Sequence, residues 1–311
     1  MVAMRFSILD RGAAGRLDGI AEHAQHVERL GFRRFFLAEH HGVPGIPAGQ
    51  PGMLASHVAA RTQRIRVGTA GIMVLNHPPF LVAEQINLLE ALYPGRIDIG
   101  LGSSVGFTAP VRKALRQGDP LELKPQFENE VEALLRYLRG EAAVTVRPEY
   151  AGTPIYILAG FRSVRVAARL GLGVILGGPV EMQEKAARLY REHALADAPP
   201  IISSLNIAVA DTADQARDLL LPESYAKVMA QSTGEFAPLR PARELDLEGL
   251  TSQQQRRIDE SLGHDVWGTV GEVGEELRGI GKQLGVDEFL ITGDMPDLAG
   301  RARSEEMVVE I

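Results

Sequence analysis

The sequence of 311 residues contains no cysteine and no long hydrophobic run. Without cysteine, the chain can form no disulfide bond, no thiolate zinc site and no cysteine nucleophile. This absence suits a reducing cytosol, and we expect a soluble, cytoplasmic protein. The first residues, MVAMRFSILDRG, have too short an apolar run for a signal peptide. No later segment approaches the roughly 20 apolar residues of a membrane span, so we expect no membrane partner.

Basic residues do not outnumber acidic ones. The chain has 33 Lys and Arg against 40 Asp and Glu, a formal charge of -7, and the charges are spread along its length. Proteins that bind nucleic acid neutralise phosphates with clustered basic residues, so we expect no nucleic-acid partner. Hydrophobic residues make up 45% of the sequence. That content can bury a large core, in one barrel-sized domain or in two smaller ones.

Short β-branched or aromatic runs alternate with longer segments of helical period, which is typical of parallel strands joined by crossover helices. The predicted strands are Arg5–Leu9, Arg33–Leu37, Ile65–Val74, Arg96–Leu101, Pro154–Leu158, Gly173–Leu176, Ile202–Val209 and Glu288–Ile291. Predicted helices at Leu17–Gly31, Phe80–Gly95 and Ser163–Gly171 end in a glycine that can take the left-handed cap conformation. Eight such units predict an α/β fold, a closed (β/α)₈ TIM barrel of residues 1–311, with an open doubly wound sheet as the alternative.

One segment interrupts this alternation. Leu221 to Trp267 is polar, contains Pro222, Pro238 and Pro241, and carries the charged stretch QQQRRIDE. We predict an insertion after the seventh strand, either a lid or a partly mobile loop.

Three polar residues follow the second predicted strand. Glu39, His40 and His41 come directly after an apolar run, and in a barrel they lie at the mouth, where ligands bind. One alternative is that a histidine caps a neighbouring helix while the other lies on the surface. Another is a metal site with His77 as a third ligand. Successive side chains of an extended segment point to opposite sides, so the three residues chelate poorly and we predict no metal.

Four stretches together resemble the bacterial luciferase-like flavin-dependent monooxygenases. They are AEHHGVPG, IRVGTAGIMVLNHPPFLVAEQINLLEALYPGRIDIGLG, PIYILAGFRSVRVAARLG and QRRIDESLGHDVWGTVGEVGEEL, in the order of the family. The resemblance implies a TIM barrel that binds FMN at its carboxyl face. It also implies a non-prolyl cis peptide between Ala70 and Gly71 beneath the flavin ring, and a place for His77 near the flavin and substrate.

The phosphate of the flavin has two candidate sites. Many relatives carry an arginine near Ser103, so this chain departs from that version of the pattern, although the Ser103 hydroxyl can still donate. The other site is the segment Ala159, Gly160, Phe161, Arg162 and Ser163, which precedes a predicted helix. A helix N-terminus offers free N–H groups to an anion, and a guanidinium can hold phosphate with two bonds. The resemblance places the phosphate-contacting hydroxyl at Ser163.

The resemblance predicts an FMN-dependent monooxygenase, an oxidoreductase. A separate reductase would supply reduced FMN, which reacts with dioxygen through a flavin hydroperoxide and oxygenates a small organic substrate. We assign acid–base chemistry to His40, because an imidazole of ordinary pKa near 6.5 can transfer protons at neutral pH. Glu39 and His77 complete the catalytic set, and Glu39 and His41 orient the loop. The predicted substrate pocket contains His41, Met73, Leu75 and Leu176.

Two other functions remain open from the sequence: deazaflavin-dependent hydride transfer on the same barrel, and non-catalytic flavin binding. The family's assembly implies a homodimer through the helices around Pro51–Arg61 and Phe80–Leu92, which carry broad apolar faces.

Overall fold

The computed structural model describes residues 4–12, 17–195 and 197–311. Eight parallel strands close into a barrel, in the order β1-β10-β7-β6-β5-β4-β3-β2. They are Arg5–Asp10 (β1), Arg34–Leu37 (β2), Arg66–Met73 (β3), Ile97–Gly102 (β4), Ile155–Ala159 (β5), Gly173–Leu176 (β6), Ile202–Leu205 (β7) and Glu288–Ile291 (β10). The predicted TIM barrel is confirmed, and the open sheet is wrong.

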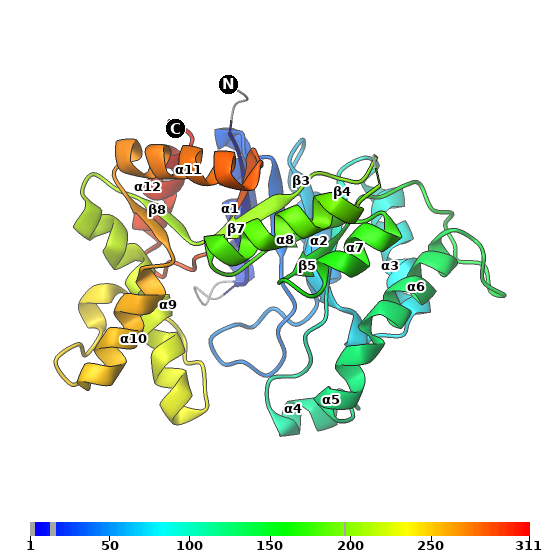
Figure 1. Cartoon of the computed structure of the whole chain (residues 1–311), viewed down its shortest axis with the longest axis horizontal. Coiled ribbons are helices and arrows are strands. Elements are labelled where there is room, and N and C mark those ends of the chain that lie inside the picture. Colours follow the sequence, from blue (N-terminus) through cyan, green and yellow to red (C-terminus); the bar gives the residue numbers. More distant parts are fainter. Residues whose placement is uncertain (1–3, 13–16, 196) are drawn as a thin grey trace.

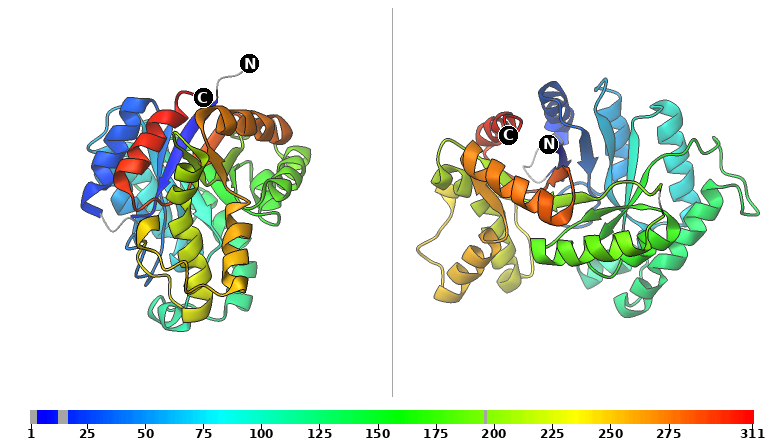
Figure 2. Two further views of the ribbon diagram at one scale, coloured as in Figure 1. Left: turned by 90° about the vertical axis from the view of Figure 1, so that its left-hand side faces the viewer. Right: turned by 45° about the horizontal axis from the view of Figure 1, so that its top comes forward.

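The helices are Ile20–Leu30 (α1), Pro51–Ala59 (α2), Pro79–Leu92 (α3), Ala109–Ala114 (α4), Pro120–Leu123 (α5), Phe127–Leu138 (α6), Val164–Leu170 (α7), Val180–His193 (α8), Ala213–Thr233 (α9), Ser252–Leu262 (α10), Val270–Leu284 (α11) and Leu298–Val308 (α12). Most helices pack around the barrel, and α4, α5, α9 and α10 form two arms at its carboxyl end (Figures 1 and 2). As predicted, Gly31 and Gly171 end α1 and α7 in the left-handed conformation, with φ of 88° and 71°. Within the described ranges, no helix combines the length and apolar character needed to cross a membrane.

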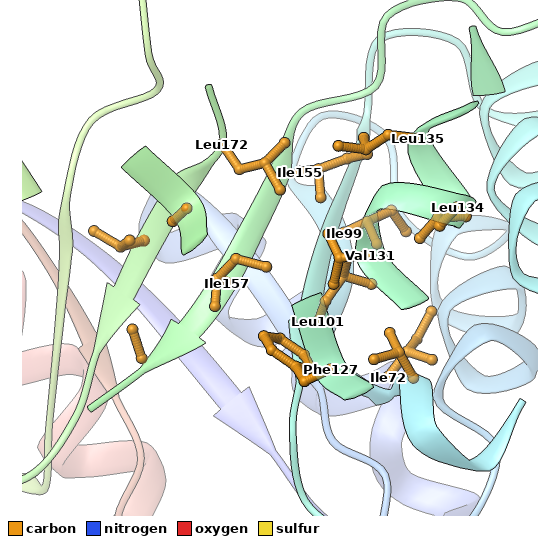
Figure 3. Packing of buried hydrophobic residues seen from close by; sticks show 14 of the residues in the cluster. Ile72, Ile99, Leu101, Phe127, Val131, Leu134, Leu135, Ile155, Ile157 and Leu172 are labelled. Carbon is orange, nitrogen blue, oxygen red and sulfur yellow. The ribbon is translucent and has the colours of Figure 1, made fainter. Parts of the chain in front are cut away.

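The larger part of the core lies between the strands and the outer helices. Figure 3 shows this packing where Ile99 and Leu101 of β4 meet Phe127 and Val131 of α6. Alternate residues of the strands point into the barrel, where a smaller apolar cluster contains Phe36, Ala70, Tyr156, Ile175, Ile202 and Leu290. The alternation therefore gives the barrel two separate apolar layers.

Charged residues fill the amino end of the barrel. Arg34 is 3% exposed, donates to Asp98 at 3.1 Å and pairs with Glu288. Ser7 also donates to Glu288, at 2.7 Å. These paired charges close the end of the barrel opposite to the strand carboxyl ends, where TIM barrels carry no chemistry.

The seventh predicted strand, Ile202–Val209, is divided at Asn206. Ile207–Val209 (β8) leaves the barrel and pairs with Val266–Gly268 (β9) in a separate two-stranded sheet. The Asn206 carbonyl accepts from the Val266 N–H at 2.9 Å, and its side chain donates to Asp265 at 2.9 Å. These bonds turn the chain away from the barrel, which corrects the prediction of one continuous strand.

The segment predicted as an insertion, Leu221 to Trp267, contains helices, and the first of them starts before the predicted beginning of the segment. α9 starts at Ala213 and continues through Pro222 to Thr233, and α10 follows within the same segment. Pro222 favoured a break, because a proline inside a helix removes a backbone hydrogen bond and crowds the preceding turn, but here α9 continues past it. Leu219, Leu220 and Leu221 are buried beside it and hold the helix in place.

Candidate active site

The carboxyl ends of the strands lie between two helical arms, α4 with α5 and α9 with α10 (Figure 1). The loop 38–50, which follows β2, contacts both arms. Gly45 donates its N–H to the Phe236 carbonyl at 3.1 Å, and Gly42 lies against the side chain of Val111. Because the chemistry of TIM barrels occurs at this end, the residues that follow the strands are the candidates.

Glu39 is the centre of a hydrogen-bonded group that we call the Glu39 cluster. Its carboxylate accepts from His41 Nε2 at 2.7 Å, His77 Nε2 at 2.8 Å, Asn76 Nδ2 at 2.9 Å and the Met73 N–H at 2.9 Å. The side chain of Glu39 is completely buried. The fold therefore brings together three predicted site residues, Glu39, His41 and His77, and adds Asn76.

The pKa of Glu39 reflects two opposing effects. Burial raises it, while the hydrogen bonds from His77, His41 and Asn76 lower it, and the net pKa lies below its ordinary value. A carboxylate with a lowered pKa does not donate a proton at neutral pH. Glu39 therefore holds the two imidazoles in place.

The Glu39 cluster is also joined to the α4–α5 arm. The Gln117 side chain donates to Asn76 Oδ1 and accepts from the Gly106 N–H at 2.8 Å. Asn76 thus connects Glu39 to the segment that follows α4. Nothing in the local sequence pattern indicated Gln117.

His40 lies in the same loop but outside the Glu39 cluster. The backbone N–H of His40 donates to the Ala48 carbonyl at 2.8 Å. The buried ring atom Nδ1 has no hydrogen-bond partner among the described residues. Burial, and next the charge of Arg11, lower the pKa of His40 to about 4. The ordinary value that the sequence suggested is therefore wrong. At neutral pH the imidazole is neutral, so it can accept a proton or a hydrogen bond.

A network of buried charges lies beside His40 at the mouth. Arg11 follows β1, pairs with Glu223 of α9 at 2.9 Å, and contacts Asp294, which follows β10. Lys227 pairs with Glu223 at 2.7 Å, and the Asp294 N–H donates to Glu223 at 2.9 Å. Burial, opposed by Arg11, raises the pKa of Asp294 to about 7. The sequence analysis missed these residues, although the rule that strand ends carry the site applied equally to β1 and β10.

The end of β3 has a special backbone. The peptide bond between Ala70 and Gly71 is cis, as the family resemblance implied. A Cβ at Gly71 would lie 2.6 Å from the Gly100 carbonyl oxygen and 2.8 Å from Leu158 Cδ1. This position therefore accepts only glycine.

Three neighbouring strands end in glycines that face open space. A Cβ at Gly160, Gly177 or Gly178 would meet no atom within 4 Å, and one at Gly102 only the Ile72 carbonyl at 3.8 Å. Backbone without side chains allows a ligand to approach closely. The ends of β4, β5 and β6 thus present bare backbone to open space, and we call them the glycine cradle.

The two predicted phosphate sites both flank this cradle. Ser163 is the N-cap residue of α7, but its side chain makes no capping hydrogen bond. Phe161 and Arg162 are exposed, Ala159 is buried and Ser103 is half-buried. Arg162 has no ion pair with another described residue, which leaves its guanidinium available to a ligand.

The predicted substrate wall needs correction. Leu176 is fully buried in the outer layer with Val164 and Ala186, and Leu75 packs against the same layer. Ile175, the residue before Leu176, points into the barrel instead. A strand alternates, so an apolar residue near its end can face either side. Met73 is 7% exposed and contributes its N–H to Glu39.

Among the described residues, no group of three or more His, Cys, Asp or Glu side chains is arranged to hold a metal ion. Within the Glu39 cluster, the Nε2 atoms of His41 and His77 are directed at a carboxylate oxygen. Hydrogen bonds to the Glu39 carboxylate therefore hold these two imidazoles in the cluster.

The chain is similar to known proteins over most of its length. The family model described as luciferase-like monooxygenase matches residues 2–288. N-acetyl-S-alkylcysteine monooxygenase of Bacillus subtilis (strain 168) is 29% identical over 313 residues, covering 93% of this chain and 92% of the relative.

Two solved structures share the fold. The crystal structure of apo-MsnO8 has a TM-score of 0.84 at 26% identity and covers 99% of this chain and 98% of that one. The oxygenating constituent of 3,6-diketocamphane monooxygenase from Pseudomonas putida, in complex with FMN, has a TM-score of 0.73 at 15% identity and covers 99% and 97%. At that identity the second likeness shows the fold alone.

Proposed function

Because the chain belongs to the luciferase-like monooxygenase family, we propose that it uses reduced FMN and dioxygen to oxygenate a small organic substrate at the mouth of its barrel. The family makes the protein an oxidoreductase.

The observation that carries the proposal is the juxtaposition of two features at the mouth of the barrel. The Glu39 cluster is formed by residues at the ends of β2 and β3, and the glycine cradle follows on β4, β5 and β6. A flat cofactor on the cradle therefore has imidazoles on its β2 side. Polar groups that converge on a ring beside bare backbone are typical of a cofactor site.

Each side chain has a distinct role in this proposal. Arg162 and the N–H groups near Ser163 hold the phosphate, with Ser103 as a further hydroxyl donor. Reduced FMN would supply two electrons, so that one oxygen atom of dioxygen enters the product and the other leaves as water. His40 is the acid–base residue, and because its imidazole is neutral at rest, its first step is to accept a proton. Glu39 keeps His77 and His41 in one orientation.

The substrate is an organic molecule small enough to lie in the barrel mouth. Leu9 and Leu158 are partly buried against the interior cluster, and together with Met73 they supply its apolar contacts. A thioether is one candidate class, since a relative is named for the oxygenation of an alkylcysteine. Dioxygen is the second substrate, and a separate reductase delivers the reduced cofactor.

The homodimer is the proposed assembly. Met53 of α2 is 72% exposed, and Leu81, Leu88 and Leu92 of α3 are 53–56% exposed. The three leucines are seven and four residues apart, so they share one helix face. Contiguous exposed apolar residues mark an interface. Leu81 also lines a cavity of about 190 Å³ beside Glu39 and His77, so a partner on this face would shield the cluster from that side.

Titration with reduced and oxidised FMN and with a reduced deazaflavin, followed by absorbance, tests the cofactor. We expect reduced FMN to bind, and we expect oxygen uptake above the reductase background when a thioether panel is added. Binding of the deazaflavin alone would replace the proposal with hydride transfer. Flavin binding without oxygen uptake for any substrate class would favour the non-catalytic alternative.

A further inference from the structure

A second group of buried charges lies behind β1, on the outer side of the barrel. His23 of α1 is 7% exposed, and its ring bonds to Asp10 at 2.6 Å and to Glu305 of α12 at 2.8 Å. Arg301 lies 3.7 Å from Glu305 and 3.9 Å from Asp10. Neither the Glu39 cluster nor the proposed cofactor site uses these residues.

This group reaches solvent through a groove between α1 and α12. The groove has a volume of about 460 Å³, and His23, His26, Arg301 and Glu305 are among its lining residues. His26 Nε2 lies 3.5 Å from Glu305 Oε2, and both atoms are buried without a hydrogen-bond partner among the described residues. His26 is itself half-buried, so it stands between solvent and Glu305.

On its inner side the group meets Asp294 of the mouth. A small void of about 10 Å³ has Asp10, His23, Asp294, Arg301 and Glu305 among its lining residues, and most of the others are apolar. That volume is near the lower limit for one water molecule, and a buried water needs two to four polar partners. The void offers enough of them, and Glu305 Oε2 lacks a donor that a water could supply.

Asp294 is placed to hold a proton at the inner end. It faces Arg11, which follows β1, and Glu223 of α9, and the charges of Asp10 and Arg301 act on it from β1 and α12. Glu223 pairs with both Lys227 and Arg11, whereas Asp294 pairs with Arg11, so positive charge stabilises the ionised form of Asp294 less. Its pKa, raised to about 7, means that it gains and loses a proton near neutral pH.

We propose that His26, Glu305, one water molecule in the void and Asp294 form a proton path between the groove and the mouth of the barrel. His23, Asp10 and Arg301 hold Glu305 and the water in position. A proton enters from solvent at His26 and another leaves Asp294 at the mouth. Each transfer breaks one N–H or O–H bond and forms another, and no electron moves.

The use of the path rests on the proposed function. When reduced flavin enters as an anion, one flavin, one dioxygen, one substrate and one proton give oxidised flavin, oxygenated product and water. Cofactor and substrate cover the mouth during this reaction, so a proton that enters from behind β1 avoids opening it. Arg11, which contacts Asp294, follows β1, and β1 lies next to β2, the strand that precedes His40.

The water has a direct test. A crystal structure of the cofactor-free chain at high resolution should show one water within hydrogen-bond distance of both Asp294 and Glu305. A dry or collapsed void would overturn the proposed link.

Proton transfer is tested by a pH jump on the cofactor-free chain. The infrared band of the protonated Asp294 carboxyl, identified by its loss in Asp294→Asn, reports the exchange with solvent. We expect Glu305→Gln to slow the change of this band at least tenfold. His26→Gln, a milder change nearer the surface, should slow it in the same direction if the first variant folds poorly.

Asp265→Asn is the matched control. Asp265 is also a carboxyl near the mouth, with a pKa that burial raises to about 6, but it bonds to Asn206 and lies outside the path. In this variant the infrared band of Asp294 should change at the same rate as in the unmodified chain. Equal rates in Glu305→Gln and His26→Gln would overturn the path. Since no cofactor is present, failure of FMN to bind would count against the proposed function alone.

Discussion

Replacing Glu39 with glutamine tests whether this carboxylate organises the mouth. One of its oxygens accepts from His41, His77 and Asn76, and the other accepts from the Met73 N–H. If the amide oxygen keeps the first three bonds, the amide nitrogen faces the Met73 N–H, and two donors then oppose each other. An unpaired buried N–H costs about 1–3 kcal/mol, and a bond to a neutral acceptor is about 1 kcal/mol weaker than one to a charged acceptor.

We therefore expect Glu39→Gln to lower the free energy of unfolding by about 4–6 kcal/mol, from one unpaired buried N–H and three weakened hydrogen bonds. Urea denaturation monitored by circular dichroism measures it. Glu310→Gln, an exposed acid, is the matched control and should change the free energy of unfolding by less than about 0.5 kcal/mol. An unfolding midpoint of Glu39→Gln within error of this control would refute the reasoning.

The pH dependence supplies a second readout for the same variant. The pKa of Glu39 is lowered in the folded state, so its contribution is fully present above its ordinary pKa of 4.5 and is lost as the pH falls through the folded value. The difference in unfolding free energy between the two proteins should thus be constant near neutrality and shrink in acid. A difference that grows as the pH falls would contradict the assignment.

Three further predictions concern the proposed activity and assembly. His40→Ala should leave FMN affinity nearly unchanged but lower oxygenation by roughly 10²–10⁴-fold, with hydrogen peroxide as the uncoupled product. Product and peroxide are measured together. His41→Ala should cause a smaller loss, and a larger loss in His41→Ala would assign the acid–base role to His41 instead. Arg162→Ala with Ser163→Ala should weaken FMN binding by roughly 1.5–3 kcal/mol through the lost phosphate bonds; unchanged affinity in titration would instead point to Ser103. Leu88→Glu should give a monomer of 33.7 kDa in light scattering, whereas a dimer that persists would place the interface on another face.

The sequence by itself determined the elements. Strand-like and helix-like periods are local, and seven of the eight barrel strands begin and end within one residue of the predicted positions. The seventh was predicted to continue to Val209 but ends at Leu205. The positions of Glu39, His40, His41 and His77 at the mouth also followed, because a residue directly after a barrel strand lies at its carboxyl end. The cis bond between Ala70 and Gly71 came from the resemblance of the surrounding motif.

Only the tertiary structure decided which of these residues meet. His41 and His77 bond to Glu39, while His40 lies near Arg11, and a run of three polar letters does not distinguish these partners. Leu176 faces outward and Ile175 inward, because the side that a strand residue takes depends on how the barrel closes. Arg11 is more than two hundred residues away from both Glu223 and Asp294 along the chain. Closure of β1 against β10 brings it to Asp294, and α9 supplies Glu223. Local periodicity carries no information about such contacts, since they depend on the relative placement of whole elements.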